Sequence, residues 1–153
     1  MSGLSRALVG CGARKADTAK PAGELYTGPY FTKNRRYANV VCDDWVILSA
    51  KHNVIEPDEV IEPYDKTLND MDADACAEWA ARTFEQLLEL EWDGYETAEI
   101  LAGENYWSYF ESRLDELPVD VEFPLADAGG MGHQMQRAQE LIDEEINSDA
   151  MDW

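Results

Sequence analysis

The sequence predicts a single α/β domain in which a mainly parallel sheet of about four strands has helices on both faces. Short apolar runs that end in glycine or polar residues alternate along the chain with longer segments of helical periodicity. The length of 153 residues suits one domain, and a hydrophobic fraction of 45% is sufficient for a packed core. We therefore expect one domain over residues 1–146 and a flexible C-terminal tail over residues 147–153.

The expected strands are short apolar segments, at residues 6–10, 43–50, 97–103 and 119–125. The clearest of them begins at Asp43, continues through β-branched and aromatic residues, and is followed by a polar loop. The segments between the strands have the length of helical connections. Parallel pairing of the strands is therefore expected.

The strongest predicted helix is residues 72–93, where apolar side chains recur at steps of three and four residues and Asp72 or Asp74 can cap the N-terminus. Further helices are expected within residues 22–41, at about 105–117 and at 132–146. Residues 51–70 show little periodicity, so they are expected to form a long loop, and loops of this length are often functional.

The net charge of −20 comes from 32 acidic and 12 basic residues. Self-repulsion at such a charge destabilises a folded domain unless salt screens it, and at molar ionic strength the Debye length is only about 3 Å. We therefore expect a protein of a salt-accumulating halophile, archaeal or viral. An acidic protein of a mesophile is the alternative.

The sequence carries no pattern typical of membrane, secreted or metal-binding proteins. No run approaches the roughly 18 apolar residues of a membrane span, and the first residues contain no signal-peptide core, so a cytoplasmic protein without a membrane partner is expected. Cys11, Cys42 and Cys76 are irregularly spaced, and His52 and His133 are far apart. No disulfide framework, metal site or cofactor is expected from this spacing.

Basic residues are concentrated in the first third of the chain. Residues 1–51 contain eight basic and four acidic residues, a net charge of +4, whereas the rest carries a net charge of −24. This asymmetry predicts an anion site for a phosphate-bearing small molecule or a nucleic acid, with Lys15, Arg35 and Arg36 as phosphate contacts. The alternative is that these cations pair with the protein's own carboxylates.

The first candidate site follows the first expected strand, because ligands of parallel α/β sheets bind at the carboxyl ends of the strands. Cys11 and Gly12, followed by Lys15, lie in a strand-to-helix turn of a kind that binds phosphate through backbone N–H groups. Cys11 is a candidate nucleophile. A small buried cysteine that ends the strand is the alternative.

The second candidate site follows the strand that ends near residue 50. Ser49 and Lys51 are candidate ligand contacts there, and His52 is a candidate catalytic base, with an ordinary solvated loop as the alternative. The long loop that follows places Tyr64 beside Asp65, and both are candidate ligand contacts.

The third candidate site is at Gly103, where Glu104 is the leading candidate for an acid, base or nucleophile and Tyr106 can stack on a base. A simple helix start, with Glu104 near the positive end of the helix dipole and Tyr106 in the core, is equally consistent with the sequence. Further candidate contacts are aromatic residues and a glycine-rich turn, namely Tyr26, Tyr30, Gly130, Gly132 and Gln134.

Taken in order, these segments resemble a family of uncharacterised prokaryotic and viral domains. The motifs are C-G-x-x-K from Cys11, A-x-x-L-Y-x-G-x-x-F, W-x-I-L-S-A-K-H, P-Y-D-x-T-L, A-G-x-x-Y, and P-L before a glycine-rich turn. Asn53 stands where this pattern has glycine after K-H. The family is similar in turn to the peroxide-stress YaaA proteins, and the C-x3-K segment is similar to a signature in the core of archaeosine synthase, which modifies a deazapurine base in tRNA. The resemblance extends from about Arg6 to Leu141, and it implies an α/β fold with a polar site at the strand ends.

The main functional hypothesis is an enzyme, a transferase or hydrolase, that acts on a nucleoside, nucleotide or nucleic-acid base. In this hypothesis basic residues hold phosphate and Glu104 meets the sugar or the ring during cleavage of an N-glycosidic bond or modification of the base. A non-catalytic nucleic-acid-binding or stress-response module is the alternative. A third hypothesis, a structural or partner-binding protein, is supported only by the acidic surface. The sequence leaves the substrate and the oligomeric state open.

Overall fold

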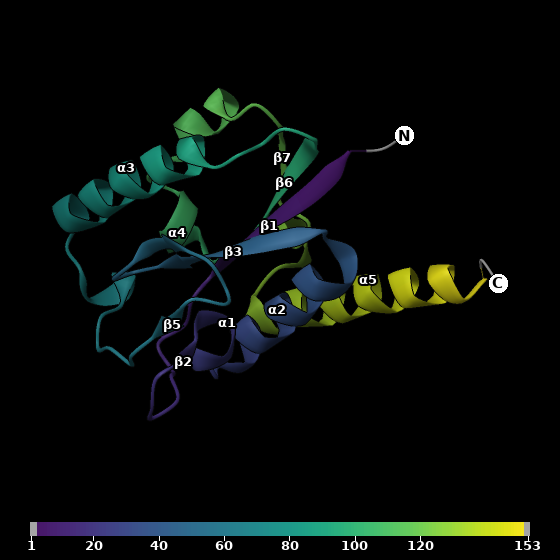
Figure 1. The fold of residues 1–153 in the computed structure, drawn as a ribbon, viewed down its shortest axis with the longest axis horizontal. Coiled ribbons are helices and arrows are strands. Elements are labelled where there is room, and N and C mark those ends of the chain that lie inside the picture. The colour runs from purple at the N-terminus through teal and green to yellow at the C-terminus, as the bar shows by residue number, and fades with distance from the viewer. Residues whose placement is uncertain (1–2, 152–153) are drawn as a thin grey trace.

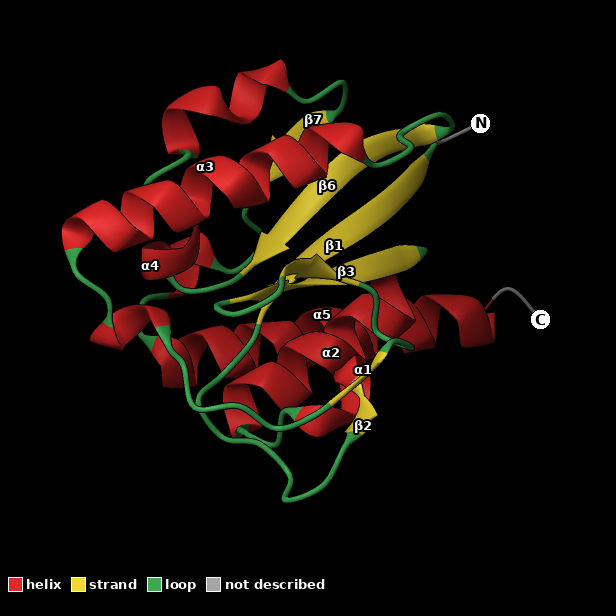
Figure 2. Ribbon diagram, turned by 60° about the vertical axis from the view of Figure 1, so that its left-hand side comes forward, coloured by secondary structure: helices red, strands yellow, loops and turns green. Residues whose placement is uncertain are grey.

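A computed structural model describes residues 3–151 and shows a five-stranded sheet between two layers of helices (Figures 1 and 2). The strand order is β4-β3-β1-β6-β7, in which the strands are β1 (Leu4–Gly10), β3 (Asp44–Ser49), β4 (Asn53–Ile55), β6 (Tyr95–Leu101) and β7 (Asp120–Glu122). Strand β1 pairs in parallel with β3 and β6, β6 pairs in parallel with β7, and β4 is antiparallel to β3. The predicted α/β domain with a mainly parallel sheet is confirmed, with one strand more than expected.

The additional strand β4 lies in the segment expected to be a loop. Asn53 begins it with a φ of 61°, in the left-handed region that asparagine tolerates better than most residues. Its amide Nδ2 also donates to Thr83 Oγ1 at 2.9 Å, which ties the start of this strand to α3. Further along the same segment, β5 (Val60–Ile61) pairs with β2 (Lys20–Pro21) in a separate two-stranded sheet. Two- and three-residue strands are too short to show a period in the sequence.

One face of the sheet is covered by α1 (Ala22–Leu25), α2 (Pro29–Val41) and α5 (Met131–Met151) (Figure 2). Helices α2 and α5 lie side by side. They cover one large apolar cluster, to which the sheet contributes Val9, Ile47 and Leu101. Helix α5 continues to Met151, beyond residue 146 where the sequence pattern ends the helix, and residues 152–153 of the expected tail lie outside the described residues.

The opposite face is covered by α3 (Ala73–Glu89) and α4 (Glu104–Trp107). Helix α3 matches the predicted helix, and Asp72 caps it by accepting from Ala75 N at 2.8 Å. The single helix expected at 105–117 is instead the short α4 and a 3-10 turn at Glu111–Glu116, because the backbone at Phe110 (φ −119°, ψ 8°) leaves the helical region. The buried Phe110 ring lies 5.6 Å from the Phe84 ring. No helix within the described residues is both long and apolar enough to cross a membrane.

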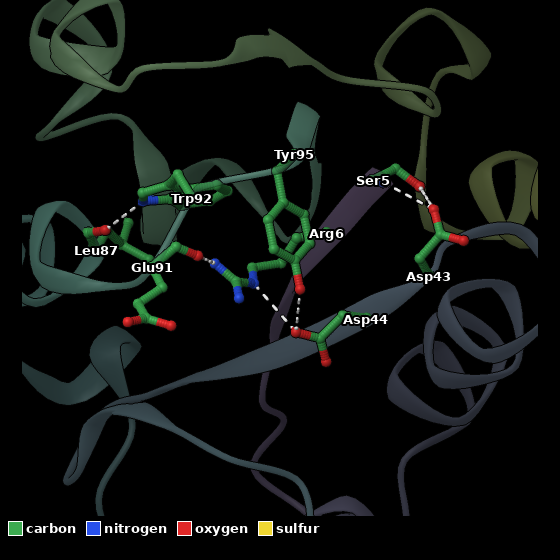
Figure 3. Close-up of polar contacts among 8 residues, drawn as sticks. All are labelled: Ser5, Arg6, Asp43, Asp44, Leu87, Glu91, Trp92 and Tyr95. Carbon is green, nitrogen blue, oxygen red and sulfur yellow. Dashed lines mark hydrogen bonds and ion pairs between the residues drawn. The ribbon is translucent and has the colours of Figure 1, made fainter. Parts of the chain in front are cut away.

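Arg6 shows that one of the basic residues of the first third has a structural role (Figure 3). It is only 7% exposed, and its guanidinium lies 4.7 Å from the Trp92 ring and 4.1 Å from the Tyr95 ring. Its Nε donates to Asp44 Oδ2 at 3.2 Å, and a second nitrogen donates to the carbonyl of Glu91 at 2.9 Å. Pairing with the protein's own carboxylate, the alternative weighed for the basic cluster, therefore holds for Arg6.

Replacing Asp44 with alanine should lower the free energy of unfolding by about 2 kcal/mol, because the buried guanidinium of Arg6 loses its counter-charge while Asp44 itself is partly exposed. Urea denaturation measures the change. Asp43→Ala is the matched control, since among residues 3–151 Asp43 accepts from the Ser5 N–H and hydroxyl, in exposed hydrogen bonds, and its loss should cost clearly less. Equal losses in the two variants would contradict the role assigned to Asp44.

Candidate functional site

The carboxyl end of β1 holds a thiol between two tyrosine hydroxyls. Cys11, 8% exposed, extends the β1–β3 ladder by donating its backbone N–H to Leu48 O at 3.0 Å, and this bond fixes the position of the thiol. Tyr106 donates its hydroxyl to Cys11 O at 2.6 Å, and the same hydroxyl oxygen lies 3.3 Å from Cys11 Sγ. The Tyr64 hydroxyl approaches Sγ from another side at 3.8 Å.

A cluster of hydroxyl groups lies behind the thiol at the carboxyl end of β3. The Tyr64 hydroxyl is 2.6 Å from the Tyr26 hydroxyl and 2.7 Å from Ser49 Oγ. Ser49 Oγ also accepts the backbone N–H groups of Lys51 at 3.2 Å and His52 at 3.0 Å, which leaves its own proton for Tyr64. The cluster therefore joins the β3 exit to the loop that carries Tyr64.

Burial raises the pKa values of these tyrosines, so they stay protonated well above neutral pH. The pKa of Tyr26 is raised to about 12, and the nearby Cys11 adds to the effect of burial. The pKa values of Tyr64 and Tyr106 are raised for the same two reasons, burial first. All three side chains are thus hydroxyl donors around the thiol.

Lys15 supplies a positive charge to the site. Its Nζ lies 4.2 Å from the centre of the Tyr64 ring and donates to Ala13 O at 3.1 Å. Burial lowers the pKa of Lys15, and the nearby charges of Cys11 and Asp65 oppose that shift. The ammonium group therefore interacts favourably with both acidic groups.

His52 lies at the edge of the same cluster, with its ring 5.4 Å from the Tyr64 ring. Burial and the charge of Lys51 lower the pKa of His52, so the imidazole is neutral at pH 7. Its backbone N–H, rather than its ring, bonds to Ser49.

A pocket of about 310 Å³ opens on Cys11. Its walls include the aromatic rings of Tyr30, Phe31 and Tyr106 and the first residues of α2. The amide groups of Asn105 and Asn69, joined by a hydrogen bond of 2.9 Å, provide polar atoms on another wall. A Cβ added to Gly12 or Gly28 would meet no atom within 4 Å, so at both positions the backbone faces open space that a ligand can enter.

A second cavity of about 240 Å³ adjoins the first, because Tyr30 and Gly103 line both. Its walls carry the side chains of Glu104 and Gln134. The Tyr30 hydroxyl donates to Gln134 Oε1 at 2.6 Å between the two cavities. The two adjoining cavities can together hold a ligand that has a flat part and a polar part.

Comparison with known proteins places the chain in a family. A model described as a family of unknown function, DUF6884, matches residues 7–140. The chain belongs to this family. The uncharacterized protein YfjM of Bacillus subtilis (strain 168) is 27% identical over 144 residues, which cover 90% of this chain and 94% of YfjM. A solved structure, the crystal structure of AF0587, a protein of unknown function, overlaps 90% of this chain with 17% identity and a TM-score of 0.47, and this chain spans only 44% of that one.

In this DUF6884 domain, the candidate residues named from the sequence fall into three groups. One group makes up the hydrogen-bonded cluster at the thiol or lies beside a member of it, namely Cys11, Lys15, Tyr26, Ser49, Lys51, His52, Tyr64, Asp65 and Tyr106. A second group lines the two cavities without touching the thiol, namely Gly12, Tyr30, Gly103, Glu104 and Gln134. The third group lies outside both cavities, namely Arg35, Arg36, Gly130 and Gly132.

The positions of Glu104 and Arg35 make the roles suggested for them from the sequence less well supported. Glu104, the leading acid or base candidate, is exposed, and it lines the second cavity rather than the Cys11 pocket. Arg35 donates to Gly23 O at 2.9 Å, which is a structural contact.

Sequence reasoning did not name Phe31, Asn69 and Asn105 as pocket residues. Asn69 comes from a 3-10 turn within the expected loop, and nothing in the local pattern indicates that it faces Asn105. Within the described part of the DUF6884 chain, no three His, Cys, Asp or Glu side chains are grouped to hold a metal ion.

Proposed function

We propose that this chain is an enzyme that acts on a nucleoside, nucleotide or nucleic-acid base, with Cys11 as its reacting group. The observation that carries the proposal is the position of the thiol, at the wall of a pocket of about 310 Å³ and between tyrosine hydroxyls. A pocket near the lower end of the usual range of ligand-site volumes suits one base or nucleoside better than a dinucleotide.

The pocket walls match the chemistry of a base. Aromatic rings stack on any base, and the amides of Asn69 and Asn105 can exchange hydrogen bonds with its polar edge. The N-terminus of α2, which begins at Pro29 without a side-chain cap, provides N–H groups and a positive dipole end for a phosphate. A sugar attached to the base would reach the second cavity, where Glu104 and Gln134 lie.

The reaction that fits this arrangement is addition of the Cys11 sulfur to an electron-poor ring carbon. The carbon–sulfur bond forms as the C=N electron pair moves to the nitrogen, and the thiol proton passes to that nitrogen by way of the Tyr106 hydroxyl, which touches the thiol and also lines the pocket. The resemblance of the C-x3-K segment to a signature in the archaeosine synthase core supports chemistry on a base.

Iodoacetamide should alkylate Cys11 faster than the other two thiols, because Cys11 lines the pocket of about 310 Å³ while hydrogen bonds within the described part of the chain hold the other two. Cys42 donates to Glu99 Oε2 at 3.2 Å, and burial with the charge of Glu99 raises the pKa of its thiol, while Cys76 is covered by the carbonyls of Leu68 and Met71. Peptide mass spectrometry gives the three rates. A nucleoside, nucleotide or free base from a screened panel should slow the labelling of Cys11 alone.

Cys42→Ser is the control, since Cys42 lies at the end of α2 opposite to the pocket, and the change should leave both the Cys11 rate and its protection unchanged. Equal labelling of the three thiols would contradict the position assigned to Cys11. If no compound of the panel protects Cys11, the proposed substrate class is wrong.

A further inference from the structure

A basic groove runs from the Cys11 pocket along helix α2. Its volume is about 770 Å³, and its walls carry the side chains of Arg14, Lys33, Arg35 and Arg36. Arg14 and Pro29 line both the groove and the pocket, so the two spaces are continuous.

The charge of the groove is opposite to that of the chain as a whole. The chain has 32 acidic residues and a net charge of −20, yet none of the described residues that line the groove is acidic. Lys33 bonds to Gln139 Oε1 on α5 and Arg35 bonds to Gly23 O, so these two cations also hold the fold together. Arg14 and Arg36 have no ion-pair partner among residues 3–151, and both are exposed. Their positive charge is available to an anion.

The groove is longer than one phosphate requires. At 1.5 Å per residue, Arg36 lies about 10 Å along the helix axis from Pro29, where the groove meets the pocket. The phosphate of a nucleotide seated in the pocket can reach Arg14 and the N-terminus of α2, but it does not extend to Arg36. Two exposed cations at different points of an open groove, with two half-buried ones between them, fit a chain of phosphates.

We infer that this groove binds the phosphodiester backbone of a single-stranded nucleic acid whose unpaired base enters the Cys11 pocket. The inference rests on the proposed function, and it narrows the substrate from a nucleoside or nucleotide to a strand. The strand is single because Cys11 is only 8% exposed and its pocket has room for one base, so a base stacked and paired in a duplex cannot reach the thiol.

Fluorescence anisotropy with labelled oligonucleotides tests the inference. Single-stranded RNA and single-stranded DNA are titrated separately at several KCl concentrations, with folding checked by circular dichroism at each, and unlabelled duplex and a nucleoside triphosphate serve as competitors. The expected result is binding of at least one single strand, with weak competition by the duplex and by the triphosphate. Affinity should fall as the salt concentration rises.

The double variant Arg14→Ala/Arg36→Ala removes the two cations that lack ion-pair partners. For single strands each lost phosphate contact lowers the slope of log affinity against log salt by about 0.7, so affinity should fall roughly 20-fold at 0.1 M salt and the difference should disappear near 1 M. Arg82→Ala is the matched control, because Arg82 is an equally exposed cation on α3, across the sheet from the groove. It should bind as the unaltered protein does.

Three outcomes overturn the inference. The first is that neither strand binds, and the second is that the double variant and Arg82→Ala lose affinity equally. The third is that the triphosphate displaces the labelled strand as effectively as an unlabelled strand does, and that its binding depends on the same two arginines. That result would assign the groove to a nucleotide polyphosphate. In each case protection of Cys11 by a nucleoside would leave the proposed function standing, so the two failures are distinguishable.

Discussion

Raising the pH to about 11 should remove about 8 kcal/mol from the free energy of unfolding, enough to unfold most domains of this size. The cause is a set of buried acidic groups whose pKa values burial raises, namely Tyr26, Tyr37, Cys42, Tyr64 and Tyr106. A raised pKa means that the native state keeps a proton that the unfolded chain releases. Stability is therefore complete below the unfolded pKa values, 9.0 for cysteine and 10.0 for tyrosine, and is lost as the pH rises toward about 12 for Tyr26 and further for the others.

Urea denaturation at a series of pH values measures this slope, and each group contributes about 1.4 kcal/mol per pH unit within its window. Tyr26→Phe/Tyr64→Phe removes two of the groups, so the loss of stability with pH should become less steep. Tyr109→Phe, which changes an exposed side chain, is the control. Stability that does not change between about pH 9 and pH 11 would contradict the burial of these hydroxyls.

Periodicity in the sequence was sufficient to predict the layers of the fold. Strands β1, β3 and β6 each contain a short apolar segment, and α3 repeats its apolar residues with a helical period over seventeen residues. The short strands β4 and β5 have no such signal, since a φ of 61° at Asn53 and pairing with a distant strand determine them. Helix α4 similarly ends at Trp107, and Phe110, which follows it, packs against Phe84 in another element.

For the site, the rule that ligands bind at the carboxyl ends of parallel strands selected residues that the fold does bring together. Cys11, Ser49 and Tyr106 lie at the carboxyl ends of three different strands and belong to one hydrogen-bonded cluster with Tyr64. Which of them would contact the thiol could not be predicted, because Tyr64 belongs to an irregular loop that folds back over β3. The charge asymmetry also could not separate Arg6, which is buried, from the exposed Arg14 and Arg36, since composition carries no information on partners.

Glu99 was not recognised in the sequence at all, and its replacement by alanine should lower the free energy of unfolding by about 3–4 kcal/mol. This carboxyl group on β6 is 8% exposed and lies beneath α2. It accepts from the Tyr37 hydroxyl at 2.6 Å and from the Cys42 thiol at 3.2 Å. Alanine would leave a cavity and two buried donors without an acceptor, and denaturation with urea at neutral pH measures the loss.

Two further variants separate the contribution of the hydrogen bonds from that of packing. Glu99→Gln keeps the volume and one acceptor oxygen for Tyr37, so it should lose about 1–2 kcal/mol. Glu99→Leu/Tyr37→Phe replaces both partners of the shorter bond with apolar groups of similar shape, and because no strong donor is then left unpaired, it should recover most of the stability lost in Glu99→Ala. If the double variant were as unstable as Glu99→Ala, the loss in the free energy of unfolding would come from the packing beneath α2. The carboxyl group would then not be the acceptor that fixes Tyr37 and Cys42.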